Sequence, residues 1–126
     1  MHLGGKINRE KFWGRITMEL IDNVKVPKFH FQGNFQQTLA GADQGLKTYE
    51  VWRLGVAPGH ELPDNRHQGE VVVLTLRGTG RLVVDNEQAE LRPDTTVVIP
   101  PGALRQVFNT GPEELLLLLV RGVVAP

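Results

Sequence analysis

Three side chains in this sequence, Asn65, His67 and Arg105, are of types that could together bind a small acidic molecule. An arginine guanidinium is cationic at every relevant pH, and its planar set of donors matches a carboxylate or a phosphate. An imidazole with an ordinary pKa of about 6.5 can move protons close to neutral pH. A side-chain amide can orient a hydroxyl or a carbonyl group. These types favour recognition of an anionic or polar metabolite, provided that the fold brings the three side chains together.

Each of these side chains also has a structural interpretation that needs no ligand. Arg105 could pair with a carboxylate such as Glu50 or Glu70, or reach water at the mouth of a barrel, because a buried guanidinium is costly without a partner. His67 could serve only as a hydrogen-bonded group, and Asn65 could simply hold the loop beside it. The residues alone leave these alternatives open.

Short strands are the elements that would position these residues. β-branched segments alternate with turns rich in glycine, proline and asparagine, a pattern typical of strands and hairpins. The expected strands cover residues 24–35 (an edge strand), 47–56, 71–76, 81–85, 89–91, 95–99, 105–109 and 115–120. Within 105–109 the side chains of Arg105, Val107 and Asn109 share one face. Many short strands with little helix predict an all-β sandwich or barrel.

The N-terminal region has a different pattern. Apolar side chains at helical spacing follow Asn8, which would suit a helix N-cap. We therefore expect residues 1–23 to form an arm or a short helix, and residues 24–126 to form a single barrel domain. A chain of 126 residues is of the right length for one domain.

Composition narrows the classes of partner. Lys and Arg together number 14, as do Asp and Glu, so no net charge attracts nucleic acid. No apolar run approaches the roughly 20 residues of a membrane span, and no signal-peptide pattern is visible. We expect a cytoplasmic protein that binds neither nucleic acid nor membrane.

The run Leu115–Val120 is apolar at every position, although a strand with one wet face should alternate. Both faces of this strand should therefore be covered. The cover could be the N-terminal region, a neighbouring layer of strands or a second subunit. We favour a homodimer, because an exposed apolar patch is rare on soluble monomers.

The spacing around Arg105 resembles the second sequence signature of the cupin family. Pro100, Gly102 and Asn109 occupy signature positions. Arg105 stands where the family has a metal-binding histidine, and Asp94 stands at the opening glycine. The resemblance implies an all-β jelly-roll, also called a double-stranded β-helix, with a barrel cavity.

An upstream segment resembles the first cupin signature. The shared positions are Pro58, Gly59, Pro63, His67 and Gly78. Asn65 stands at the first histidine of the family's His-x-His pair, and Val71 stands at its metal-binding glutamate. Glu70 is one residue too early to replace that glutamate, because adjacent strand residues face opposite sides.

The resemblance therefore implies a barrel that departs from the usual metal site. Of the four ligand positions only His67 offers a good ligand, and Arg105 would repel a divalent cation. We expect no cofactor and no metal. The alternative is a different metal site on the loop at the barrel mouth, formed by His60, His67 and Glu70.

The resemblance suggests three functions. The first is a metal-independent, small-molecule-binding barrel, in which Arg105 meets the acidic group of the ligand while His67 and Asn65 orient it. The second is an enzyme, either isomerase-like or epimerase-like with His67 as general acid or base, or a dioxygenase if the alternative metal site forms. The third is a structural dimer with an idle cavity.

Overall fold

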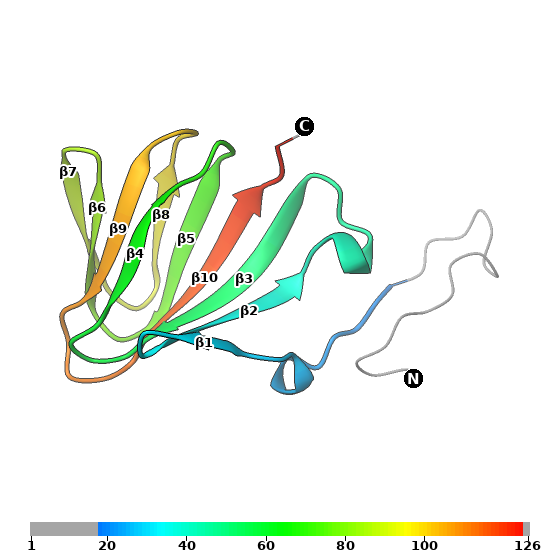
Figure 1. Cartoon of the computed structure of the whole chain (residues 1–126), viewed down its shortest axis with the longest axis horizontal. Helices are drawn as coiled ribbons and strands as arrows, with labels where there is room; N and C mark the ends of the chain where they lie inside the picture. The colour runs from blue at the N-terminus through cyan, green and yellow to red at the C-terminus, as the bar shows by residue number, and fades with distance from the viewer. Residues whose placement is uncertain (1–17, 125–126) are drawn as a thin grey trace.

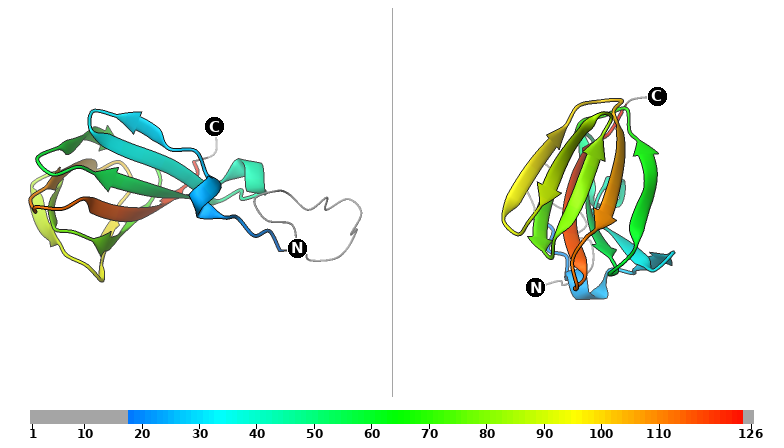
Figure 2. Two further views of the ribbon diagram at one scale, coloured as in Figure 1. Left: turned by 90° about the horizontal axis from the view of Figure 1, so that it is seen from below. Right: turned by 90° about the vertical axis from the view of Figure 1, so that its left-hand side faces the viewer.

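The computed structural model describes residues 18–124, which form two antiparallel β-sheets packed face to face (Figure 1). Sheet A has the strand order β1-β2-β3-β10-β5-β8, and sheet B has the order β4-β9-β6-β7. The strands are β1 Phe29–Phe31, β2 Asn34–Ala40, β3 Tyr49–Val56, β4 Glu61–Arg66, β5 Val71–Arg77, β6 Gly80–Val84, β7 Glu87–Leu91, β8 Thr95–Ile99, β9 Leu104–Asn109 and β10 Leu115–Gly122. In the right-hand view of Figure 2, strands of sheet B lie in front of the red strand β10 of sheet A.

The strand pairing is that of a double-stranded β-helix. β3 pairs with β10, β4 with β9, β5 with β8, and β6 with β7. The first four of these strands therefore pair with the last four in nested antiparallel order. This order is that of a jelly-roll. The all-β jelly-roll expected from the sequence is confirmed.

Two strands were not expected from the sequence. β2 (Asn34–Ala40) carries three polar residues in its first four, and β4 (Glu61–Arg66) contains proline, aspartate and asparagine, which are rare in strands. β4 is a strand because it pairs with β9, and the register shifts between Leu62 and Asn65, next to Pro63. A bulge of this kind accommodates a residue that cannot donate a ladder hydrogen bond. Tertiary pairing therefore overrides local propensity here.

The N-terminal helix expected from the sequence falls mostly on residues 1–17, which lie outside the described part of the chain. Residues 18–22 carry no regular structure, and a 3-10 turn, η2 (Asn23–Lys25), follows. The Gln37 side chain of β2 donates to the carbonyls of Asn23 and Val26 at 3.2 and 2.8 Å, which ties this segment to sheet A. No helix within residues 18–124 is long and apolar enough to cross a membrane.

Positive backbone φ angles explain two of the signature positions. Gly78 has a φ of 85°, and a Cβ there would lie 2.6 Å from the carbonyl oxygen of Glu114. Asp94, at the family's glycine position, has a φ of 65°. Aspartate is one of the few residues with a side chain that tolerates this left-handed region, so the turn is preserved without glycine.

The hydrophobic core lies between the two sheets. Its buried members include Leu54, Val56, Val71, Val73, Leu82, Leu91, Ile99, Val107, Leu115, Leu117 and Leu119. Strand β10 therefore alternates after all: its odd-numbered leucines are buried in the core, and Leu116, Leu118 and Val120 point outward and are half-buried.

The outward side chains of β10 belong to a continuous apolar surface on sheet A. We call this surface the outer face and define it by Val72, Leu74, Leu76, Val98, Leu116, Leu118 and Val120. Its members align across strands, since Val120 is opposite Val72, and Val72 is opposite Val98. Val98 is 67% exposed and Leu76 is 46% exposed. The core covers the inner side of β10. Within residues 18–124, Val98 and Leu76 of the outer face stay exposed.

Asn109 joins the end of β9 to strand β3. Its side chain is buried, and Nδ2 donates to the carbonyls of Val56 and Glu113, each at 2.8 Å. Its Oδ1 accepts from the backbone N–H of Gly111 at 2.9 Å. One amide therefore satisfies three backbone groups at the turn into β10.

We expect Asn109→Ala to lower the free energy of unfolding by about 2–4 kcal/mol, because buried backbone groups lose their partner. Urea unfolding followed by circular dichroism measures this change. Asn86→Ala is the matched control, since Asn86 is exposed and makes no hydrogen bond with residues 18–124; it should change stability by less than about 0.5 kcal/mol. Equal effects of the two substitutions would contradict the role of Asn109.

Candidate functional site

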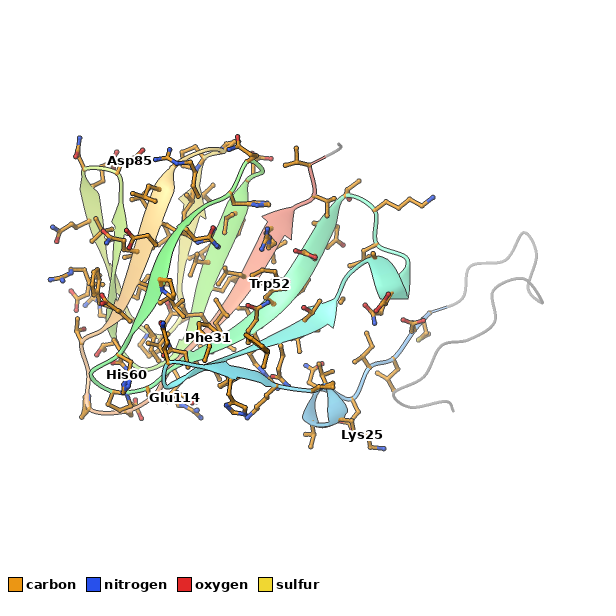
Figure 3. The ribbon with its side chains drawn as sticks, in the orientation of Figure 1. Lys25, Phe31, Trp52, His60, Asp85 and Glu114 are labelled. Atoms are coloured by element: carbon orange, nitrogen blue, oxygen red, sulfur yellow. The ribbon has the colours of Figure 1, made fainter. Side chains whose placement is uncertain are left out.

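A cavity of about 200 Å³ lies between the two sheets. Its apolar walls include Phe31, Trp52, Leu54, Leu62, Val73 and Leu119. Phe31 on β1 and Trp52 on β3 are labelled in Figure 3. The polar side chains on the wall are Gln36, Asp64, Asn65 and Arg105. Two of the three predicted ligand-binding residues, Asn65 and Arg105, therefore line one cavity.

Arg105 enters this cavity from β9. It lies opposite Asn65 of β4 and Val84 of β6, and the whole residue is only 7% exposed. Burial lowers the pKa of the guanidinium below its ordinary value, and the nearby charge of Arg121 lowers that pKa further. Arg105 makes no hydrogen bond or ion pair with any residue in 18–124. The carboxylate partner considered for it, Glu50 or Glu70, is not in contact with it.

Arg121 is a second arginine at the same end of the barrel, and the sequence analysis did not single it out. Its Nε lies 3.1 Å from Oε1 of Glu50, the residue directly opposite it on β3. Its Nη2 donates to Nδ1 of His67 at 2.8 Å, and its guanidinium lies 4.1 Å from the centre of the Trp52 ring. Arg121 is therefore held on three sides, and Glu50 balances its charge.

One sequence signal could have identified Arg121. The core leucines of β10 recur at every second position, at 115, 117 and 119, and Arg121 continues this phase. The apolar run ends at Val120, so Arg121 lies one residue outside the segment that hydrophobicity identifies. Its partner Glu50 lies 71 positions earlier and could be paired with it only through the strand register.

The two hydrogen bonds of His67 assign the tautomer of its ring. A guanidinium can only donate, so Nδ1 of His67 accepts from Arg121 and the ring proton is on Nε2. Nε2 donates that proton to the carbonyl of Gly122 at 2.6 Å. Both ring nitrogens of His67 are thus engaged by the protein. It is not on the cavity wall, and it contacts the site through Arg121.

The alternative metal-binding residues do not come together. His60 and His67 lie just beyond the two ends of β4, so about 20 Å of extended chain separates them. His60 is exposed and makes a 3.0 Å hydrogen bond through Nδ1 with the carbonyl of Pro58. Glu70 is also exposed. Within residues 18–124, no three His, Cys, Asp or Glu side chains are grouped so that they could hold a metal ion.

The four positions where the family resemblance places metal ligands do not fit a divalent cation either. Val71 is part of the core, and Arg105 brings a positive charge to the cavity. The lone pair of His67 already accepts a proton from Arg121. Asn65 alone remains, and one neutral amide is far from the three or four ligands that such a site requires.

Comparisons with known proteins agree with this architecture. A family model described as "Cupin domain" matches residues 52–121. Auxin-binding protein T85 of Nicotiana tabacum is 31% identical over 82% of this chain, which spans 63% of that relative's length. A cupin 2 domain-containing protein of Halorhodospira halophila, of known structure, is 34% identical with a TM-score of 0.64, covering 71% of this chain and 63% of that one.

A more distant structure supports the fold alone. The polyketide cyclase RemF of Streptomyces resistomycificus has a TM-score of 0.76 at 18% identity, covering 87% of this chain and 82% of that one. The nested strand pairing, the turn positions of both signatures and the family match over more than half of the sequence lead to one conclusion. This chain belongs to the cupin family.

Proposed function

We propose that this cupin barrel binds a small organic acid with an apolar body, and that Arg105 meets the acidic group of the ligand. One observation carries the proposal: a buried guanidinium lines an apolar cavity and has no partner among residues 18–124. An uncompensated buried charge costs several kcal/mol, so a partner for it is strongly favoured. A carboxylate supplies two acceptors that match the guanidinium fork.

The size and walls of the cavity support a small ligand. Its volume of about 200 Å³ exceeds the roughly 150 Å³ of a cavity that admits benzene. It is below the range of about 300–1,000 Å³ that is usual for drug-sized ligands. Apolar residues from both sheets form most of the wall, so an aromatic or branched aliphatic body would be desolvated there.

Two other polar groups are placed to orient the ligand. The indole Nε1 of Trp52 is buried and has no hydrogen-bond partner within residues 18–124. Such a donor normally finds an acceptor, and a ligand oxygen could be that acceptor. Asn65, opposite Arg105 in the register, offers an amide. The tobacco relative is named for binding auxin, so small-ligand binding has a named precedent among similar proteins.

The role of His67 in this proposal is indirect. It holds Arg121, which in turn packs on Trp52 at the cavity wall. Acid–base catalysis by His67 would need one ring nitrogen to leave its present partner and face the cavity. The geometry therefore favours binding over the isomerase-like reaction.

We expect Arg105→Met to raise the free energy of unfolding of the ligand-free protein by at least about 1 kcal/mol, because the apolar side chain removes an unpaired buried charge. Arg53→Met is the matched control. Arg53 is half-buried but donates from Nε to Oε1 of Gln37 at 2.7 Å, so its replacement should lower stability. Urea unfolding of both variants gives the comparison, and a loss of stability in Arg105→Met would show that Arg105 has a structural partner.

We expect the wild-type protein to bind phenylacetate, and Arg105→Met to weaken that binding by about 10- to 100-fold, the usual value of a charge-assisted hydrogen bond. Isothermal titration calorimetry measures both affinities. Arg81→Met is the control, because Arg81 is exposed and lies over the Phe108 ring; it should bind as wild type does. Neutral phenylacetamide should bind the wild type more weakly, and equal binding of the two probes would mean that Arg105 does not meet the acid.

We also propose that a second copy of this chain covers the outer face of sheet A. The face is apolar along β10 and β5 and at Val98 of β8, and Arg53 and Thr96 lie beside it, opposite Leu118 and Leu74. An apolar surface can pair with itself about a two-fold axis, which is the commonest symmetry of soluble oligomers. A homodimer would bury Val98 and Leu76, the most exposed side chains of the outer face.

We expect Val98→Glu to raise the dimer dissociation constant at least about tenfold, because each two-fold contact would bury a charge from both copies. Sedimentation velocity over a concentration series measures this constant. Val24→Glu is the matched control: Val24 is 90% exposed and lies outside the outer face, so the dimer should persist. A wild-type protein that stays monomeric at high concentration would refute the homodimer.

A further inference from the structure

We infer that Glu50 sets the ligand charge that this cavity accepts. By neutralising Arg121, it leaves one uncompensated guanidinium, so the site selects acids with one negative charge over acids with two. This inference rests on the proposed function, and it adds a specificity-determining residue that does not line the cavity.

The two arginines act on the same region. Arg105 comes from β9 of sheet B and Arg121 from β10 of sheet A. Burial lowers the pKa of Arg105, and the charge of Arg121 lowers that pKa further, in keeping with two cations at one end of the barrel. Arg121 also packs on the ring of Trp52, a residue of the cavity wall. A ligand bound at Arg105 would therefore feel the charge on Arg121.

Glu50 removes most of that second charge. It is directly opposite Arg121 in the register, and the ion pair is 3.1 Å long. The two side chains are only 17% and 28% exposed, so water screens the pair less than it would a surface pair. The hydrogen bond to His67 and the contact with Trp52 hold Arg121 in place beside Glu50. The pair is thus close to neutral as seen from the cavity.

The carboxylate that lines the cavity wall itself is that of Asp64. Asp64 is exposed, and its Oδ1 accepts from Nε2 of Gln106 at 2.8 Å. It forms no ion pair with either arginine, and it is not among the causes that shift the pKa of Arg105. Its charge is solvated at the rim. Arg105, Arg121 and Glu50 therefore leave the interior with a net charge of one positive unit.

This charge balance has a direct consequence for ligands. A single carboxylate meets Arg105 and neutralises the interior. A second carboxylate on the same ligand would find only Arg121, which is already shared with Glu50, and it would be repelled by the Glu50 carboxylate. The second charge would lose its hydration without gaining a free partner.

Two probes with the same body test this inference: phenylacetate, with one carboxylate, and phenylmalonate, with two, both at pH 7.5 by isothermal titration calorimetry. We expect the wild type to bind phenylacetate at least about tenfold more tightly than phenylmalonate. In Glu50→Gln, Arg121 is free to meet the second carboxylate, so this ratio should shift toward phenylmalonate by about tenfold or more.

Two controls separate charge from other effects. Glu114→Gln breaks an ion pair with Arg77 that has a length of 2.9 Å and lies at the exposed start of β10, the opposite end from Arg121. This variant should keep the wild-type ratio. The double variant Glu50→Gln/Arg121→Gln restores a net charge of one, so it should return to the wild-type preference although both side chains are changed.

The outcomes distinguish the inference from the proposed function. Failure of the wild type to bind either probe overturns the proposed function itself. Binding of phenylacetate with equal or tighter binding of phenylmalonate by the wild type overturns only the inference, as does an unchanged ratio in folded Glu50→Gln. If Glu50→Gln does not fold, Arg121→Gln serves instead: its interior charge is zero, so phenylacetate should bind about tenfold more weakly, and unchanged binding overturns the inference.

Discussion

A cross-strand ion pair between Arg121 and Glu50 organises the polar end of this barrel. The pair fixes Arg121 against Trp52 and His67, and it occupies the inward carboxylate that Arg105 could otherwise have used. Arg105 consequently remains buried without a partner among residues 18–124. Arg121 is paired and Arg105 is not, so this end of the barrel carries one uncompensated positive charge.

The unpaired Arg105 affects both the stability of the barrel and the proposed binding of a ligand. A buried cation without a partner destabilises the empty barrel, and the nested strand pairs supply the rigidity that keeps it in place. The core leucines and valines of both sheets provide that rigidity. The resemblance to cupins places metal ligands at these positions. Here an arginine stands at one of them, and this is the basis for proposing an acidic ligand.

Much of the fold followed from local pattern. The β-branched segments and the proline and glycine turns predicted the strands from β5 to β10, and the signature spacing placed Arg105 inside the barrel. β2 and β4 were missed because their polar residues have low strand propensity and become strands only by pairing with β3 and β9. Asn65 and Arg105 share the cavity as expected, whereas His67 contacts it only through Arg121.

The sequence by itself determined which side chains share a face, because alternation along a strand is a local property of the backbone. The resemblance to the two cupin signatures, carried by the spacing of prolines, glycines and polar residues, implied the family and an inward Arg105. Only the tertiary structure decided which carboxylate pairs with which arginine, and that Glu50 meets Arg121 rather than Arg105. Partner choice depends on the register between strands far apart in the chain, and no local pattern specifies that register.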